Sequence, residues 1–241
     1  MSNIKIKNIN KNVSSIIINE PKAYNSLSFK NLNDLIKAFD KLNVSKSIKV
    51  IIIEGSGPGF SAGHNLKEVR GLKSKSKYQK LFNLCSKLML KIVEGRKPVI
   101  AKVHGAAFAA GCQLVASCDL AYSTNDAKFA TPGVNIGLFC STPMVAVSRK
   151  VSRKKMMKML LTGDPINAKY AKEIGLINDH FSKSNLTIKI GKQAFYKQLD
   201  MPLRKAYDFT SRMMTLNMMA MDAKEGISAF IEKRKPKWKN K

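Results

Sequence analysis

Two turns of small residues follow apolar segments of the chain and could present main-chain N–H groups to a ligand. The first, GSGPGFSAGH at 55–64, comes after the apolar run 50–53, and the second, GAAFAAG at 105–111, comes after the apolar run 98–103. Small side chains let a ligand approach the backbone, and the first N–H groups of a helix lack partners within that helix. Two such turns could stabilise a carbonyl oxygen that gains negative charge, which is the chemistry of an oxyanion hole.

Cysteine and histidine side chains are the other candidates for chemistry. The cysteines form no C-x-x-C pair and stand in apolar surroundings, which predicts buried, reduced thiols: Cys85, Cys112, Cys118 and Cys140. The histidines lack metal-ligand spacing, so no metal is expected: His64, His104 and His180. Cys140 and Ser141 precede a predicted helix start, which could stabilise a thiolate. For both, and for Asn135, a purely structural role is the alternative, and Asp119 is expected to fix the turn after a helix.

The net charge of +27 allows two interpretations. A strongly basic chain can bind nucleic acid or an anionic membrane surface. However, lysines outnumber arginines 36 to 7 and are spread along the chain, and asparagine and isoleucine are also abundant. Proteins that recognise base sequence favour arginine for its two-pronged contacts. We therefore favour compositional bias over nucleic-acid binding, although the charge could help to attract an anionic substrate.

Alternating strands and helices predict an α/β fold. Apolar runs predict strands at 13–18, 50–53, 98–103, 120–123 and 128–129. Helical spacing of apolar residues predicts helices at 28–42 and 81–92. The polar segment 71–80, between the turn at 55–64 and the second of these helices, is expected to be a mobile loop or a frayed helix. Further helices are expected at 153–161, 166–173 and 201–233, the last with a methionine stripe expected to serve packing.

Four short motifs in a fixed order carry a family resemblance. FSAGHNLKE at 60–68, together with HGAAFAAGCQLVASCDLAYSTNDAKFATPGVNIGL at 104–138, resembles the crotonase (enoyl-CoA hydratase/isomerase) superfamily. The resemblance covers nearly the whole chain, from EPKAYNSL at 20–27 to EGISAFIEKRKPKW at 225–238. Within the superfamily, AAGCQLVASCD and FATPGVNIGLFCSTP are most similar to the branch of enoyl-CoA hydratase domain-containing protein 3.

The resemblance implies an α/β fold of the crotonase (ClpP/crotonase-like) type, with repeated ββα units and a C-terminal helical trimerisation region. We place the core at 1–185 and the C-terminal helical region at 186–241. Self-association as a homotrimer or a homohexamer, a dimer of trimers, is implied. One departure is expected to matter for stability: the family usually has a further helix where Leu186 here runs directly into Thr187.

The same resemblance implies an acyl-CoA thioester as the bound partner. Family members hold the thioester carbonyl with two backbone N–H groups, which correspond here to His64 and Ala110. Contacts to coenzyme A are implied for Lys22, Ala23, Ala62, His64, Asn65, Leu66 and Lys67 and, from the tail of a neighbouring subunit, for Phe230 and Lys233. Coenzyme A enters as part of the substrate, and no separate cofactor is expected.

Both acid–base residues of the family's hydratases are replaced. Hydration needs one group to activate water and one to deliver a proton, and the family uses two glutamates. Their positions hold Gln113 and Gly133, and an amide cannot take up a proton at neutral pH. We therefore expect weak or absent hydration (lyase activity), with isomerisation, thioester hydrolysis or decarboxylation left open and Ser141 as a further catalytic candidate. A non-catalytic acyl-CoA-binding or interaction protein is the alternative, and an RNA-binding crotonase homologue ranks behind it.

The compartment is predicted from the first residues and the thiols. MSNIKIKNIN lacks the apolar core of a secretory signal and contains no arginine, so neither a signal peptide nor a mitochondrial transit peptide is expected. Together with the reduced thiols, this predicts a cytoplasmic protein, and the crotonase resemblance implies a role in fatty-acid or acyl-CoA metabolism. No apolar run reaches the roughly 18 residues of a membrane span, so no membrane association is expected.

Overall fold

The structure, a computed structural model, describes residues 2–178, 185–234, 236–237 and 239. These residues belong to two compact units, one of residues 1–93 with 99–179 and one of residues 94–98 with 180–241. The sequence placed the boundary at residue 185. Each unit is described by itself below.

The first unit is built on a five-stranded sheet, in the order β1-β2-β3-β5-β7. Its strands are β1 (Ile4–Asn8), β2 (Val13–Ile18), β3 (Val50–Gly55), β5 (Val99–Val103) and β7 (Leu120–Ser123). The edge strand β1 is antiparallel to β2, and the other pairs are parallel. Parallel neighbours need crossover connections, and the helices between the strands supply them.

A second sheet holds the short strands that continue the long ones. Its order is β4-β6-β8-β9, with β4 (Gly59–Ser61), β6 (Ala106–Phe108), β8 (Lys128–Ala130) and β9 (Ile166–Asn167). The chain alternates between the sheets, because β3 leads to β4, β5 to β6 and β7 to β8. In the first two of these repeats the strand pair is followed by a helix, α2 (Leu66–Gly71) or α4 (Ala110–Ser117). These are the repeated ββα units that the sequence predicted.

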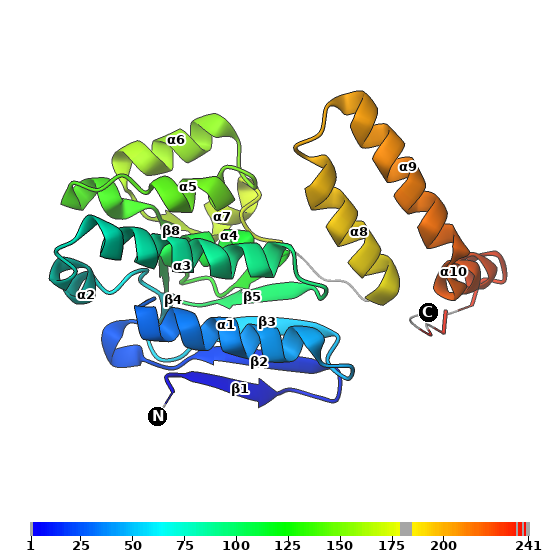
Figure 1. Cartoon of the computed structure of the whole chain (residues 1–241), viewed down its shortest axis with the longest axis horizontal. Coiled ribbons are helices and arrows are strands. Elements are labelled where there is room, and N and C mark those ends of the chain that lie inside the picture. Colours follow the sequence, from blue (N-terminus) through cyan, green and yellow to red (C-terminus); the bar gives the residue numbers. More distant parts are fainter. Residues whose placement is uncertain (1, 179–184, 235, 238, 240–241) are drawn as a thin grey trace. The chain divides into compact units, whose positions relative to one another are not determined.

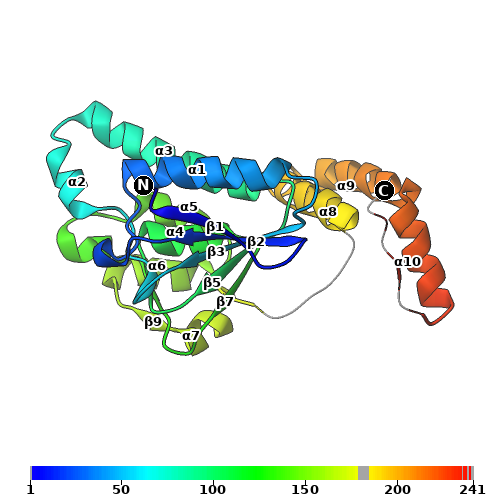
Figure 2. The same ribbon diagram turned by 90° about the horizontal axis from the view of Figure 1, so that it is seen from below.

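Helices α1 (Phe29–Val44) and α3 (Lys75–Val93) lie beside each other along the five-stranded sheet (Figures 1 and 2). Ser28 caps α1, since its side chain accepts a hydrogen bond from the Asn31 N–H. The buried faces of both helices join one apolar core with the strands. Helix α4 is buried along its whole length.

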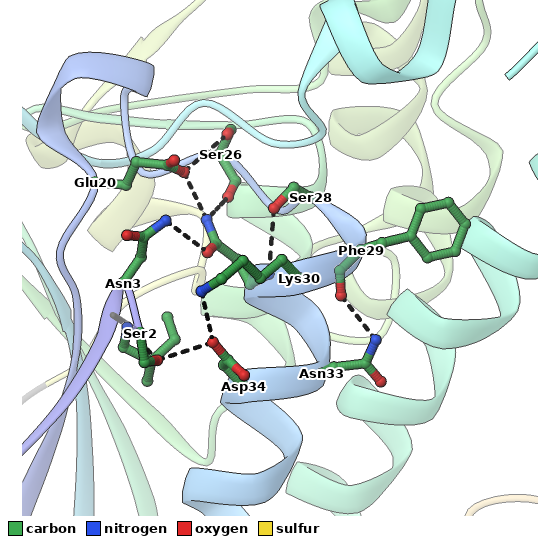
Figure 3. A network of polar contacts seen from close by, with 11 residues as sticks. Ser2, Asn3, Glu20, Ser26, Ser28, Phe29, Lys30, Asn33 and Asp34 are labelled. Atoms are coloured by element: carbon green, nitrogen blue, oxygen red, sulfur yellow. Dashed lines mark hydrogen bonds and ion pairs between the residues drawn. The ribbon is translucent and has the colours of Figure 1, made fainter. Parts of the chain in front are cut away.

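A polar network fixes the loop between β2 and α1 (Figure 3). The buried amide of Asn31 donates to Glu20 Oε2 at 2.7 Å and to the Ser26 carbonyl at 2.7 Å, and its Oδ1 accepts from Asn3 Nδ2 at 3.2 Å. The loop contains the short 3-10 helix η1 (Pro21–Ala23). Strand β1, this loop and α1 are therefore joined by side-chain hydrogen bonds as well as by the apolar core.

Two predicted segments are more finely divided in the structure. The segment 71–80, expected to be a mobile loop or a frayed helix, is helical from Lys75 onward, because helix-favouring lysine and glutamine side chains extend a helix anchored by Leu81 and Cys85. The predicted helix 166–173 is divided: Ile166 and Asn167 form β9, antiparallel to β8. Asn167 then caps α7 (Ala168–Glu173) by accepting from the Tyr170 N–H.

The rest of the first unit consists of η2 (Pro132–Ile136), α5 (Ser141–Val147) and α6 (Arg153–Thr162). Gly163 ends α6 in the left-handed conformation, with φ of 68°. Ser152 occupies the first capping position of α6, but its side chain makes no capping hydrogen bond.

The second unit contains α8 (Asn185–Gln198), α9 (Leu203–Met219) and α10 (Met221–Ile231). The predicted helix 201–233 is therefore two helices, which meet at Ala220 in an extended conformation. The junction of Leu186 and Thr187 lies in the first turn of α8, while residues 179–184, His180 included, lie outside the described residues. Of the methionine stripe, Met214, Met218, Met219 and Met221 are exposed in the single chain, so their expected packing role stays a prediction.

Candidate functional site

The two small-residue turns meet in the first unit. The first contains β4 and, after it, Gly63, which has a φ of 91°. The second contains β6 and leads into α4. A Cβ placed on Gly63 would lie 3.0 Å from the Phe108 carbonyl oxygen and 3.1 Å from the Ala110 nitrogen, and one on Gly111 would lie 2.2 Å from the Ser61 carbonyl oxygen. Glycine at these two positions therefore permits the backbones to touch.

The main-chain N–H groups of His64 and Ala110 lie at the place where the two turns touch. In the part of the chain that the structure describes, neither N–H donates a hydrogen bond, although their neighbours do. The Gly63 N–H donates to Ser61 Oγ at 3.2 Å, and the Ala109 N–H donates to the Ala130 carbonyl at 2.9 Å. Unpaired main-chain donors on two turns that touch are groups of the kind that can stabilise an oxyanion.

Ala109 shows backbone strain at the start of α4. Its φ is 47° and its ψ is −117°, a region that residues with a Cβ rarely occupy and that costs on the order of 1–3 kcal/mol. This conformation turns the chain from β6 into the helix within one residue. Such strain persists only where the surrounding structure enforces it, and here the Ala130 carbonyl and the buried helix hold the turn.

The loop of residues 20–27 lies along the first turn. The Ala62 N–H donates to the Tyr24 carbonyl at 3.0 Å, and the Leu27 N–H donates to the Gly63 carbonyl at 2.8 Å. The buried side chain of Asn25 donates to the carbonyls of Ser56 and Gly59 at 2.7 and 2.8 Å. The structure thus brings the predicted Lys22 and Ala23 to the same part of the molecule as Ala62 and His64.

Asn25 and Ser61 are residues that the sequence analysis missed. Asn25 adopts a left-handed conformation with φ of 53°, which asparagine tolerates better than most residues. Ser61 Oγ donates to the Asn25 carbonyl at 2.9 Å. An asparagine beside a predicted turn was the available signal, but its carbonyl partners stand more than thirty positions away in sequence.

The His64 imidazole is fixed beside the first turn. Its Nδ1 lies 3.0 Å from the Leu27 carbonyl oxygen, so Nδ1 carries the proton that is donated there. Its Nε2 is buried without a partner among the described residues, and the ring meets Phe82 edge-on at 5.6 Å between centroids. Burial lowers the pKa of His64 below its usual value, against the hydrogen bond to Leu27 and the nearby Glu68 carboxylate, which both raise it.

The other residues of the FSAGHNLKE motif form a helix cap. Asn65 caps α2, because its side-chain oxygen accepts from the N–H groups of Lys67 and Glu68 at 3.0 and 3.2 Å. Leu66 and Lys67 are exposed. Phe230 and Lys233 belong to the second unit, where Phe230 is 84% exposed.

The two positions that correspond to the glutamates of the family's hydratases, 113 and 133, differ in their surroundings. Gln113 is buried on α4, where its Oε1 lies 3.9 Å from the Cys85 thiol. At Gly133, in η2, a Cβ would lie 2.5 Å from the Leu138 carbonyl oxygen and 2.9 Å from Cys140 Sγ. The Gly133 N–H also donates to that sulfur at 3.3 Å. The turn at 133–140 therefore leaves no room for a side chain at position 133.

The remaining polar candidates have structural partners. Burial raises the pKa of Cys140, which favours a neutral thiol and the structural alternative for this residue, and burial raises the pKa of Cys112 to about 12. Exposed Ser141 donates its hydroxyl to the Phe139 carbonyl at 3.3 Å. The Asn135 side chain packs over Gly163. Asp119 accepts from the Val99 N–H at 2.8 Å, which confirms its predicted structural role.

The described part of the chain places no three His, Cys, Asp or Glu side chains where they could hold a metal ion together. No described helix is both long and apolar enough to cross a membrane.

Comparison with known proteins gives relatives over nearly the whole chain. The mouse enoyl-CoA hydratase domain-containing protein 3, mitochondrial, is 42% identical over 243 residues, covering 94% of this chain and 81% of the mouse protein. The crystal structure of human enoyl-CoA hydratase domain-containing protein 3 matches with a TM-score of 0.91 and 42% identity, covering 98% of this chain and all of that one. These matches confirm the predicted branch.

Two findings from the relatives bear on earlier predictions. The mouse protein and its rat and human counterparts are named as mitochondrial, so the prediction of a cytoplasmic location is wrong on this finding. It rested on the first ten residues and on reduced thiols, and neither identifies a compartment.

In addition, the match of 243 residues exceeds the 241 of this chain while covering 94% of it, so the mouse protein has residues that this chain lacks. Their place near Leu186 stays a prediction.

A bacterial structure and a family model complete the comparison. The crystal structure of an enoyl-CoA hydratase from Mycobacterium smegmatis matches with a TM-score of 0.93 and 42% identity, covering 99% of both chains. The model of the family described as enoyl-CoA hydratase/isomerase matches residues 8–189. The fold is therefore the crotonase fold, and the chain belongs to the enoyl-CoA hydratase/isomerase family.

Proposed function

We propose that this protein binds an acyl-CoA thioester and stabilises negative charge on the thioester oxygen with the N–H groups of His64 and Ala110. The observation that carries the proposal is the contact between the turns at Gly63 and Ala110, which leaves both N–H groups without a partner among the described residues. Donors fixed before the reaction stabilise a developing oxyanion without having to reorganise.

The reaction would be one that needs the oxyanion hole but not two carboxylates. Gln113 offers an amide, which can orient a carbonyl or a water but cannot accept a proton at neutral pH. Gly133 has no room for a side chain because the Leu138 carbonyl and Cys140 Sγ adjoin it. Double-bond isomerisation, thioester hydrolysis and decarboxylation each pass through an enolate or oxyanion, so the protein would act in acyl-CoA or fatty-acid metabolism without hydrating enoyl-CoA efficiently.

A non-catalytic acyl-CoA-binding role is the second candidate. It is favoured by the raised pKa values of Cys112 and Cys140, which keep both thiols neutral at physiological pH. It is also favoured by the buried Nε2 of His64, which solvent does not reach. A site that binds the thioester and has no group ready to move a proton would act as a sensor or carrier.

Recognition of coenzyme A would involve the loop that lies along the first turn. Lys22 and Ala23 would contact the adenosine end, and residues 62–67 the adenine and pantetheine. Coenzyme A is part of the substrate here, and we propose no separate cofactor. Phe230 and Lys233 would come from a neighbouring copy, in a trimer or a dimer of trimers. Exposed apolar side chains on α9 and α10 support such self-association.

Thermal unfolding with and without acetyl-, crotonyl- and long-chain acyl-CoA tests the binding step. A ligand at about 100 times its Kd stabilises the folded state by roughly 2.7 kcal/mol, which raises the melting temperature clearly. We expect an upward shift with at least one ester. A cooperative melt that no ester shifts would contradict the proposal.

Turnover assays then separate the two candidates. Isomerisation, hydrolysis or decarboxylation of an ester that shifts the melt would support catalysis, and binding without turnover across the panel would support the non-catalytic role. Efficient hydration of crotonyl-CoA, unchanged in Gln113→Ala, would overturn the proposed reaction class.

A further inference from the structure

A hollow lined by charged side chains lies between α8 and α9 in the second unit. Its volume is about 380 Å³. Three cations, one carboxylate and two apolar side chains line it: Lys197, Lys205, Arg212, Asp208, Phe209 and Met201. We refer to this hollow as the α8–α9 groove. Small-molecule sites of proteins begin at roughly 300 Å³, so the groove exceeds the needs of a single inorganic ion.

The cations of the groove are available to an anion. The Lys197 ammonium lies 5.1 Å from the centroid of the Phe209 ring, which restricts its position without neutralising its charge. Arg212 uses its Nε to donate to the Asp208 backbone carbonyl at 3.2 Å. Within the described ranges, none of the three cations forms an ion pair with a carboxylate.

The mixture of groups matches the parts of a nucleotide. An arginine fork and lysine ammonium groups bind phosphate oxygens with charge-assisted hydrogen bonds. A carboxylate beside them can accept hydrogen bonds from ribose hydroxyls, as acidic residues do in dinucleotide sites. Met201 and the edge of half-buried Phe209 offer apolar surface for a base. A bare phosphate would use the cations and leave the rest of the groove unoccupied.

Four exposed apolar side chains of α9 lie on the face opposite the groove. Lys205, Phe209 and Arg212 recur at helical spacing, as do the exposed Leu203, Tyr207, Met214 and Met218. At about 100° per residue, the two sets point in roughly opposite directions. Self-association through these four apolar side chains would not cover the groove, whereas the exposed Leu216 and Met219 lie on the groove side of α9, in the turns after Arg212.

We propose that the α8–α9 groove is a binding site for a nucleoside phosphate, built from residues other than those of the acyl-CoA site. The phosphate contacts Lys205 and Arg212 together with Lys197, and Asp208 contacts the ribose. The proposal is independent of the acyl-CoA function, because it uses only residues of α8, α9 and the link between them.

Calorimetric titration of the full-length protein with ADP tests the proposal, with inorganic phosphate and adenosine as partial ligands. Lys205→Ala/Arg212→Ala removes two exposed cations of the groove and should weaken ADP binding at least about tenfold, because each charge-assisted bond contributes on the order of 1.4 kcal/mol or more. Arg204→Ala/Lys224→Ala removes the same charge from the same unit outside the groove. This control should change the Kd less than about twofold, since exposed charges act weakly at a distance in salt.

Each of the remaining outcomes supports or overturns the proposal for the α8–α9 groove. Equal losses in the groove variant and in the control would mean attraction by net charge alone and would overturn the proposal. If Lys22→Ala abolishes ADP binding while the groove variant retains it, ADP occupies the proposed acyl-CoA site and the groove proposal fails. Binding of a single-stranded oligonucleotide through the groove without binding of ADP would also overturn it, in favour of nucleic acid. Loss of ADP binding in the groove variant, with an unchanged response to acyl-CoA, is the expected result.

Discussion

The two small-residue turns and the two positions that correspond to the family's glutamates stand close in sequence but depend on different properties of the chain. The proposed chemistry of the turns uses main-chain N–H groups, so it would tolerate a change of side chain at position 110 as long as the backbone keeps its path. The family's glutamates would act through side chains, and Gln113 and Gly133 at those positions carry no carboxylate. The role of the turns is therefore tested with variants that displace the backbone. The role of positions 113 and 133 is tested with variants that change the side chain.

The largest expected effect comes from separating the two turns. A Cβ on Gly111 would lie 2.2 Å from the Ser61 carbonyl oxygen, a backbone atom that cannot swing away. We expect Gly111→Ala to destabilise the protein by about 3 kcal/mol or more and to abolish acyl-CoA binding. Gly71→Ala is the matched control, because nothing lies within 4 Å of the added Cβ. Chemical denaturation of both variants gives the difference, and equal stability would show that the turns need not touch.

The next effect concerns the loop along the first turn. Asn25→Ala leaves the carbonyls of Ser56 and Gly59 without their donor in a buried position, and alanine tolerates the left-handed conformation less well. We expect a loss of about 2–4 kcal/mol in the free energy of unfolding. Asn33→Ala removes a single exposed hydrogen bond to the Phe29 carbonyl and should cost little. A comparable cost for both variants would mean that Asn25 does not hold the turn.

Variants at position 133 test whether the lack of a carboxylate is by itself the reason for the expected lack of hydration. Gly133→Ala should cost about 2 kcal/mol, because its Cβ meets the Leu138 carbonyl oxygen and Cys140 Sγ. Gln113→Glu/Gly133→Glu should therefore fail to hydrate crotonyl-CoA even though both carboxylates are restored. Denaturation and a hydration assay measure the two outcomes. A stable double variant that hydrates the ester would show that the turn at 133–140 adapts.

Local patterns predicted much of the fold but little of the geometry around the site. Apolar runs and helical spacing gave the strands and most helices, because burial imposes those periods directly on the sequence. The strand β9 was missed since Ile166–Asn167 is too short to show a period and pairs with β8, about forty positions away. The positive φ of Ala109 and the closed turn at Gly133 also gave no signal in the sequence, because each depends on backbone atoms brought together by the fold. Motif resemblance named His64 and Ala110, but only the structure showed that the two turns touch.

The smallest expected effect is a pH dependence that distinguishes the His64 side chain from its N–H. Burial lowers the pKa of the folded-state imidazole below its unfolded value near 6.5. As the pH falls through that value, the unfolded chain takes up a proton that the folded protein does not, so stability decreases toward acid. His64→Gln keeps the N–H and a donor for the Leu27 carbonyl but does not titrate. We expect acyl-CoA binding to persist in this variant, while urea denaturation shows a smaller loss of stability between pH 7.5 and pH 5.5 than in the wild type. Loss of binding despite a normal melt would mean that the imidazole, and not only the main chain, contacts the ligand.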